Sequence, residues 1–83
     1  MKGWYIMVTN KIKALLALKG FSFADYARAL GITPQSLQTK SKKDAYKIKD
    51  LIRLAELTGS QVSITDKETG KILVSFNPED IQN

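Results

Sequence analysis

The sequence predicts a mainly α-helical fold, with four to five helices followed by a C-terminal β-hairpin. Apolar residues recur at helical spacing through the first 60 positions, and glycines at positions 20, 31 and 59 separate the helical segments. After Gly59 apolar residues alternate with polar ones, which is typical of strands. A chain of 83 residues is long enough for one compact domain and too short for two. We therefore expect a helical body over 1–60 with an N-terminal arm over 1–9, a hairpin of the same domain over 61–77 and a loose tail over 78–83.

The N-terminal arm contains a short β-prone run from Trp4 to Val8. This run fits either a strand or an apolar arm lying on the body. Met7 is an alternative start, which would make the preceding residues an appendage, and the sequence leaves these alternatives open. From about Asn10 to Lys19 apolar residues repeat at helical spacing, which predicts a first helix with inward positions Ile12, Leu15 and Leu16.

Two helices joined by a tight turn are predicted between Ser22 and Lys42. Ser22 and Asp25 form a short capping box for the first of them. Gly31 supplies the left-handed stop that a Cβ atom disfavours, and Thr33 can cap the second helix with a proline at its first position. Apolar or small residues stand where two crossed helices must touch, namely Tyr26, Ala27, Leu30, Ile32 and Leu37.

The stretch from Phe21 to Lys42 resembles the helix-turn-helix of phage-repressor and Cro-like, XRE-type transcriptional regulators, and the likeness extends to roughly residues 10–59. It implies a repressor-like helix-turn-helix fold, sequence-specific binding of double-stranded DNA and a role in regulating transcription. Two positions depart from the family. Phe23 replaces a glutamine that usually anchors to a phosphate, so it either packs in the core or marks a face adapted to protein. Lys40 replaces a second apolar anchor, which predicts a helix that is short or frayed beyond Thr39.

The outward face of the second motif helix holds hydrogen-bonding and cationic residues if Leu37 points inward. Glutamine matches the donor and acceptor that adenine displays in the major groove, and Gln35 stands where the family commonly places a base-contacting side chain. Lysines suit phosphates, and a capped helix start such as Ser22 can approach one. We therefore expect DNA contacts from Ser22, Thr33, Pro34, Gln35, Gln38, Thr39, Lys40, Lys42 and Lys43.

The connection from Ser41 to Tyr46 is predicted to be a loop, because it is polar and basic. A further helix is expected from about Lys47 to Leu57, and Gly59 closes it. Its apolar stripe recurs at i, i+3, i+4 and i+7 and consists of Ile48, Leu51, Ile52 and Ala55, widened by Leu54.

The hairpin is predicted from two alternating runs on either side of a loop over 66–70. If Thr65 pairs with Lys71, then Ile64 faces Ile72, Val62 faces Val74, and these four apolar side chains share one face. A two-stranded hairpin alone is marginal in water. The helices, the N-terminal arm or a second copy must therefore cover that face, and we favour a homodimer formed through the hairpin.

Charge and composition narrow the function classes. Residues 1–60 contain eleven Lys or Arg against four Asp or Glu, whereas residues 61–83 contain two against four. A basic body suits a polyanion such as DNA. The chain has no cysteine and no histidine, so we expect no disulfide, no metal, no cofactor, no enzymatic activity and no small-molecule substrate. The close acidic pairs, Asp66 with Glu68 and Glu79 with Asp80, fit solvated turns.

Two further expectations concern location and the rival function. No apolar run reaches the length of a bilayer span, and no secretory signal stands at the N-terminus, so we expect no membrane association and a cytoplasmic location. The rival hypothesis is a protein-interaction module that keeps the repressor-like fold without binding DNA. RNA recognition is a poor third alternative, because the tyrosines show no clustering suited to base stacking.

Overall fold

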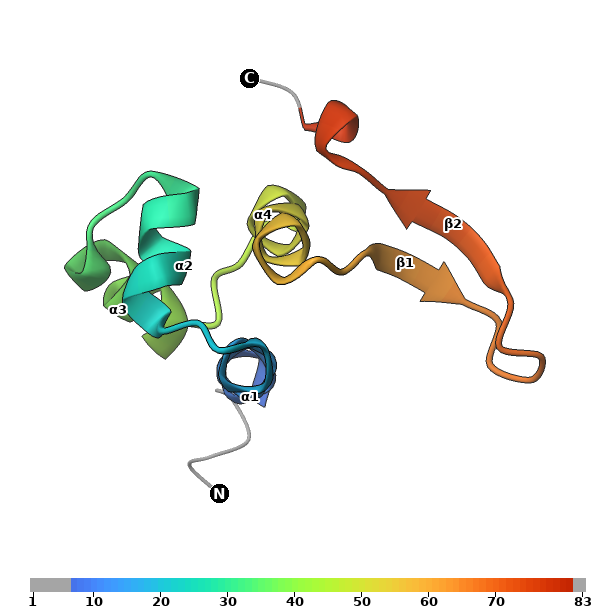
Figure 1. Ribbon diagram of the computed structural model, residues 1–83, viewed down its shortest axis with the longest axis horizontal. Helices are drawn as coiled ribbons and strands as arrows, with labels where there is room; N and C mark the ends of the chain where they lie inside the picture. Colours follow the sequence, from blue (N-terminus) through green and yellow to red (C-terminus); the bar gives the residue numbers. More distant parts are fainter. Residues whose placement is uncertain (1–6, 82–83) are drawn as a thin grey trace.

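The computed structural model describes residues 7–81 and confirms a mainly helical chain with a C-terminal hairpin (Figure 1). Helices α1 to α4 form a body, and the hairpin extends away from α4 (Figure 1). None of the helices within the described residues is long and apolar enough to cross a lipid bilayer. In chain order the elements are α1 (Met7–Lys19), α2 (Phe23–Leu30), α3 (Pro34–Lys42), α4 (Ile48–Thr58), β1 (Val62–Thr65), β2 (Ile72–Phe76) and the 3-10 helix η2 (Pro78–Asp80).

Helix α1 begins three residues earlier than expected. The N-terminal arm is therefore wrong for residues 7–9, which are helical, while residues 4–6 of the expected run from Trp4 to Val8 lie outside the described residues. The early start has a tertiary cause. Thr9 is only 3% exposed, and its backbone N–H and its hydroxyl lie 3.2 and 2.8 Å from Oδ1 of Asp44. A first-turn N–H has no partner within its own helix, so this distant carboxylate stabilises the extra turn.

The core lies between α1, α2, α3 and α4. Tyr26 and Leu37 are completely buried, as their expected inward orientation requires. The Tyr26 hydroxyl donates a 2.7 Å hydrogen bond to the backbone carbonyl of Asp50 and so joins α2 to α4. The cluster of buried apolar residues comprises Ile12, Leu16, Tyr26, Ala27, Leu37 and Leu54.

Replacing Tyr26 with phenylalanine should lower the free energy of unfolding by about 1 kcal/mol near neutral pH, because the buried hydrogen bond is lost. Burial, and secondarily the charge of Asp50, raises the pKa of Tyr26 well above the ordinary value of 10.0. The folded protein therefore holds this proton more tightly than the unfolded chain, so wild-type stability falls as the pH rises above 10. We expect the gap between wild type and variant to narrow there. Urea unfolding at neutral pH and at about pH 11 measures this, and identical pH dependence in both proteins would contradict it.

Helix α3 is longer than expected. The predicted loop from Ser41 to Tyr46 is wrong at its start, and the helix does not fray after Thr39, because it continues through Lys42. Ser41 is 6% exposed, and its hydroxyl donates a 2.7 Å hydrogen bond to the carbonyl of Gln38. A small polar residue whose hydroxyl bonds within the helix can be buried without cost to the last turn.

Helix α4 buries Ile52, Leu54 and Ala55, in agreement with the predicted stripe. Ile48 is the exception, because it is 51% exposed, so its assignment to the inward face is wrong. The first-turn residue that faces inward is Asp50. Its Oδ2 accepts a 2.9 Å hydrogen bond from the backbone N–H of Lys47, and this contact begins the helix.

The hairpin forms between the two expected runs but has a different register. Val62 pairs with Phe76, Ile64 with Val74 and Thr65 with Ile72, so the expected pairing of Thr65 with Lys71 is wrong. The loop is one residue longer than that pairing requires, and a bulge after Ile64 adds a second shift. The pairing of Val62 and Ile64 is thereby shifted by two residues, so Val62, Ile64, Val74 and Phe76 share one side and Ser63 pairs with Ser75 on the other. Ile72 pairs with Thr65 and not with Ile64, so its expected place on the same face as Ile64 is wrong.

The apolar face of the hairpin is covered only at its base. Val62 and Phe76 are half-buried near α4, whereas the outer residues are 45–64% exposed. The loose tail expected over 78–83 is wrong for 78–81, because η2 lies against α4 and Ile81 is half-buried beside it. The exposed outer residues of the hairpin are Ile64, Ile72, Leu73 and Val74.

Candidate nucleic-acid interface

Local chemistry fixes the helix that precedes the candidate interface. Ser22 Oγ accepts a 3.1 Å hydrogen bond from the N–H of Asp25, and Asp25 Oδ2 accepts a 2.8 Å bond from the N–H of Ser22. This capping box is the predicted one, and the bond from the Ser22 backbone is the main cause that lowers the pKa of Asp25. At the other end Gly31 has a φ of 72°, and Ile32 N–H donates a 3.1 Å bond to the carbonyl of Ala27. The predicted stop at Gly31 is confirmed.

Helix α3 starts at the residues that the sequence predicted. Thr33 Oγ1 accepts a 3.1 Å hydrogen bond from the N–H of Ser36, and Pro34 is the first helical residue. Leu37 is completely buried one turn later. A capped start together with a buried residue sets both the direction and the rotation of the helix.

The C-terminal end of α3 is held by contacts with distant parts of the chain. The Thr9 hydroxyl lies 3.0 Å from the carbonyl oxygen of Ser41 and 2.7 Å from the Tyr46 hydroxyl. Asp44, just after the helix, joins this cluster through Thr9, as described above. Burial is the main cause that raises the pKa of Tyr46, so its hydroxyl stays neutral and can donate. Helix α3 is thus fixed at its start, middle and end.

Lys40 forms a contact that the sequence did not indicate. Its ammonium Nζ is 3.0 Å from Oδ2 of Asp50, whose side chain is 5% exposed, and 3.4 Å from the carbonyl oxygen of Ala45. The Lys40 ammonium already has a carboxylate partner within the helical body, so it is less available to a phosphate than Lys42 and Lys43, and its phosphate contact stays a prediction. The ion pair also explains how a lysine replaces the expected apolar anchor. Its charge is balanced by Asp50, so the lysine side chain can join α3 to α4 at a partly buried position.

The other predicted residues are exposed: Ser22, Thr33, Pro34, Gln35, Gln38, Thr39, Lys42 and Lys43. Three of them already use their side-chain oxygens locally. Ser22 and Thr33 are helix caps, and the Thr39 hydroxyl donates a 3.2 Å bond to the carbonyl of Gln35. The side-chain amides of Gln35 and Gln38 form no hydrogen bond within the part of the chain that the structure describes, although their backbone carbonyls do. They are the side chains best able to bind an external hydrogen-bonding partner.

Two further residues lie beside the glutamines: Lys13, which the sequence did not indicate, and Phe23, which was expected in the core or on a face adapted to protein. Lys13 of α1 and Phe23 of α2 line the same cleft of about 450 Å³ as Pro34, Gln35 and Gln38. Lys13 Nζ lies 5.0 Å from the centroid of the Phe23 ring. The signal that could have found Lys13 is its place one residue after the buried Ile12, but the sequence does not show which helix its side chain meets.

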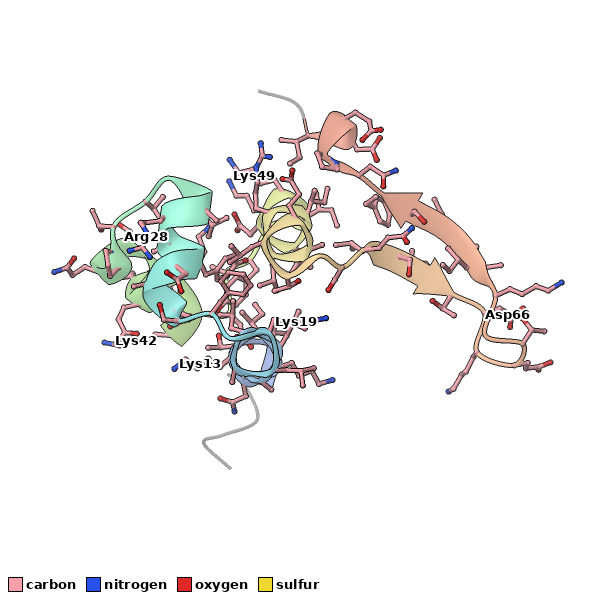
Figure 2. The ribbon with its side chains drawn as sticks, in the orientation of Figure 1. Lys13, Lys19, Arg28, Lys42, Lys49 and Asp66 are labelled. Atoms are coloured by element: carbon pink, nitrogen blue, oxygen red, sulfur yellow. The ribbon has the colours of Figure 1, made fainter. Side chains whose placement is uncertain are left out.

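The cleft and its surroundings carry positive charge. In Figure 2 Lys13 lies on the side of α1 that is turned toward α3, and Lys42 of α3 lies near it in this view, whereas Lys19 lies on the other side of α1. Lys42 and Lys43 are both exposed near the end of α3. The exposed side of α3 and its edge with α1 therefore combine amides and cations, namely Lys13, Gln35, Gln38, Lys42 and Lys43. Side-chain amides on a fixed helix can hydrogen-bond base edges, and the cations beside them can attract phosphates.

Comparisons with known proteins add no relative: no protein-family model, no curated protein and no solved structure matches this chain.

Proposed function

We propose that this chain is a repressor-like helix-turn-helix domain of the XRE type that binds double-stranded DNA with sequence preference and regulates transcription. Helix α3 enters the major groove in this proposal. Gln35 and Gln38 contact base edges, with Thr33, Pro34 and Thr39 beside them. Lys42 and Lys43 contact phosphates, and Ser22 approaches one at the start of α2.

One observation carries the proposal: two unengaged glutamine amides lie on a helix that the body holds at both ends. Specific readout requires donors and acceptors at fixed positions, because a mobile side chain loses on ordering much of what each hydrogen bond contributes. Thr33, Leu37 and Ser41 fix the helix that carries both glutamines, through a cap, a buried side chain and a carbonyl contact. Glutamine pairs best with adenine, so A·T pairs are the expected targets.

The lysines support the same proposal through affinity. A phosphate-binding side chain needs a charge that is free of carboxylates, and none of the ion pairs within residues 7–81 involves Lys13, Lys42 or Lys43. Each contact with a phosphate releases counterions, so binding should weaken as the salt concentration rises. A protein-interaction module with the same fold would show no salt-dependent binding of duplex DNA.

Selection of duplexes from a random pool tests the proposed function directly. We expect the wild-type protein to enrich a motif containing A·T pairs, and the enriched duplex to bind more tightly than a scrambled one at the same salt concentration. Binding of all duplexes with one affinity would contradict sequence preference. No binding even at low salt would favour the protein-interaction module.

We further propose that two copies associate through the hairpin. The exposed apolar residues at its outer end need a cover, and the same face of a second hairpin can supply it. Packing of the two apolar faces against each other across a two-fold axis would bury Ile64 and Val74 of both copies. Two α3 helices would then engage half-sites about one helical turn apart.

Replacing Ile64 with lysine should convert the dimer into a monomer, because Ile64 is 54% exposed on the apolar face and a charge there opposes its burial. Sedimentation equilibrium measures the change. Leu18→Lys is the matched control, since Leu18 of α1 is 78% exposed and lies outside the hairpin. Leu18→Lys should stay dimeric. A monomeric wild type, or a dimer that survives Ile64→Lys, would contradict the proposed interface.

A further inference from the structure

We infer that Lys13 is a phosphate-binding residue held in position by Phe23, and that the cleft between α1, α2 and α3 receives one phosphodiester of the DNA backbone. This inference rests on the proposed function and deepens it. It also assigns a role to Phe23, one of the two positions where the sequence departs from the family pattern.

The first step is the rigidity of the Phe23 ring. Phe23 is half-buried at the first position of α2, and its ring meets that of Tyr26 edge to face, with centroids 6.5 Å apart and planes at 67°. Tyr26 is completely buried and is hydrogen-bonded to the backbone of Asp50. A ring that packs on a fixed ring has few alternative orientations. The Phe23 ring therefore has a restricted orientation at the edge of the core.

The second step is the position of the cation. The Lys13 ammonium lies 5.0 Å from the Phe23 ring centroid, within the range in which the ring quadrupole attracts a cation. A lysine side chain ordinarily samples many rotamers, and this contact restricts them before any ligand binds. No carboxylate forms an ion pair with Lys13 within residues 7–81. Its charge is therefore available to an external anion.

The third step is the composition of the cleft. Besides Lys13 and Phe23 it is lined by Ala24, Pro34, Gln35 and Gln38. The cation and the two candidate base readers thus share one depression. When a recognition helix lies in the major groove, the preceding helix crosses the sugar-phosphate backbone. A backbone segment in this cleft would bring a phosphate to Lys13 and the deoxyribose against Phe23, Ala24 and Pro34, while the adjacent bases face the glutamines.

The test combines variants of the protein with neutral linkages in the DNA. The duplex enriched by wild-type protein is prepared in versions that each carry one methylphosphonate in place of a phosphate. Lys13→Gln should bind the unmodified duplex about 3- to 10-fold more weakly, with a salt slope smaller by about one contact. At one linkage the methylphosphonate should weaken wild-type protein and leave Lys13→Gln unaffected. Lys19→Gln, on the other side of α1, is the matched control and should keep the wild-type slope.

Phe23 is tested through its coupling to Lys13. Phe23→Leu should weaken DNA binding about 2- to 5-fold when Lys13 is present and should cause no further loss in the Lys13→Gln background. Phe23→Tyr keeps the aromatic ring and should bind like the wild-type protein. Urea unfolding of each variant identifies losses that come from misfolding. Equal slopes for Lys13→Gln and Lys19→Gln, or no methylphosphonate that distinguishes wild type from Lys13→Gln, would overturn the inference while leaving DNA binding intact. Failure of wild-type protein to bind any duplex would instead remove the proposed function, and this inference with it.

Discussion

Replacement of Asp50 with alanine should lower the free energy of unfolding by about 2 to 4 kcal/mol and remove the ion pair that joins α3 to α4. Asp50 is 4% exposed, and its carboxylate binds both the Lys40 ammonium and the N–H of Lys47. Alanine leaves the partly buried Lys40 charge without its partner and removes the acceptor at the start of α4. Removing one member of a buried ion pair costs more than the pair itself contributes, because the remaining charge stays desolvated. Urea unfolding followed by circular dichroism measures the change.

An exposed ion pair provides the matched control for Asp50. Glu56 pairs with Arg53 at 2.6 Å on α4, and both side chains are more than 40% exposed. Glu56→Ala should therefore change the free energy of unfolding by less than about 1 kcal/mol. Asp50→Asn keeps an acceptor and the shape of the side chain and should lie between the two. If Asp50→Ala destabilised the protein no more than Glu56→Ala, Asp50 would not anchor α3 to α4.

Replacement of Gln35 with alanine should weaken binding to the enriched duplex by about 1 to 3 kcal/mol and relax the preference at one base pair. The reason is that Gln35 presents an unengaged amide on a helix whose rotation Leu37 fixes. A scrambled duplex offers this amide no matched partner, so its affinity should change little. Titrations of both duplexes with wild type and variant measure the difference.

Lys42 is the matched control for Gln35 on the same helix. Its flexible point charge attracts phosphates of any sequence, so Lys42→Gln should weaken the enriched and the scrambled duplex similarly and reduce the salt slope by about one contact. Should Gln35→Ala and Lys42→Gln cause equal losses on both duplexes, Gln35 would have no role in reading sequence.

The sequence could predict the features that depend on neighbouring residues. The capping box of Ser22 and Asp25, the left-handed Gly31 and the Thr33 cap are contacts over one to three residues, so their chemistry can be read directly from the chain. The burial of Leu37 followed from the same local frame. That frame also predicted the exposure of Gln35 and its neighbours.

The contacts that the sequence did not reveal join residues far apart in the chain. Lys40 was expected at a phosphate because nothing near it indicates Asp50, which lies ten residues later on another helix. Thr9 and Asp44 are 35 residues apart, so the early start of α1 could not be predicted. The position of Lys13 over Phe23 depends on how α1 crosses α2. Helical periodicity gives a face to each helix but not its neighbour.

The hairpin register failed for a different reason. Alternation assigns each residue of a strand to a face, and this assignment was correct for Val62, Ile64 and Val74 and wrong for Ile72, which pairs with Thr65. The pairing depends in addition on the loop and on the bulge after Ile64, and neither changes the alternation enough to be recognised.

The central claim is that α3 is held by the body with its glutamines free to contact bases, and a cycle between residue and base pair tests it most directly. Affinities are measured for wild type and Gln35→Ala against the enriched duplex and against duplexes in which each A·T pair is replaced in turn by G·C. We predict one or two adjacent positions at which the replacement weakens wild-type binding by about 1 to 3 kcal/mol and leaves the variant unchanged. The same positional pattern in both proteins would contradict the claim.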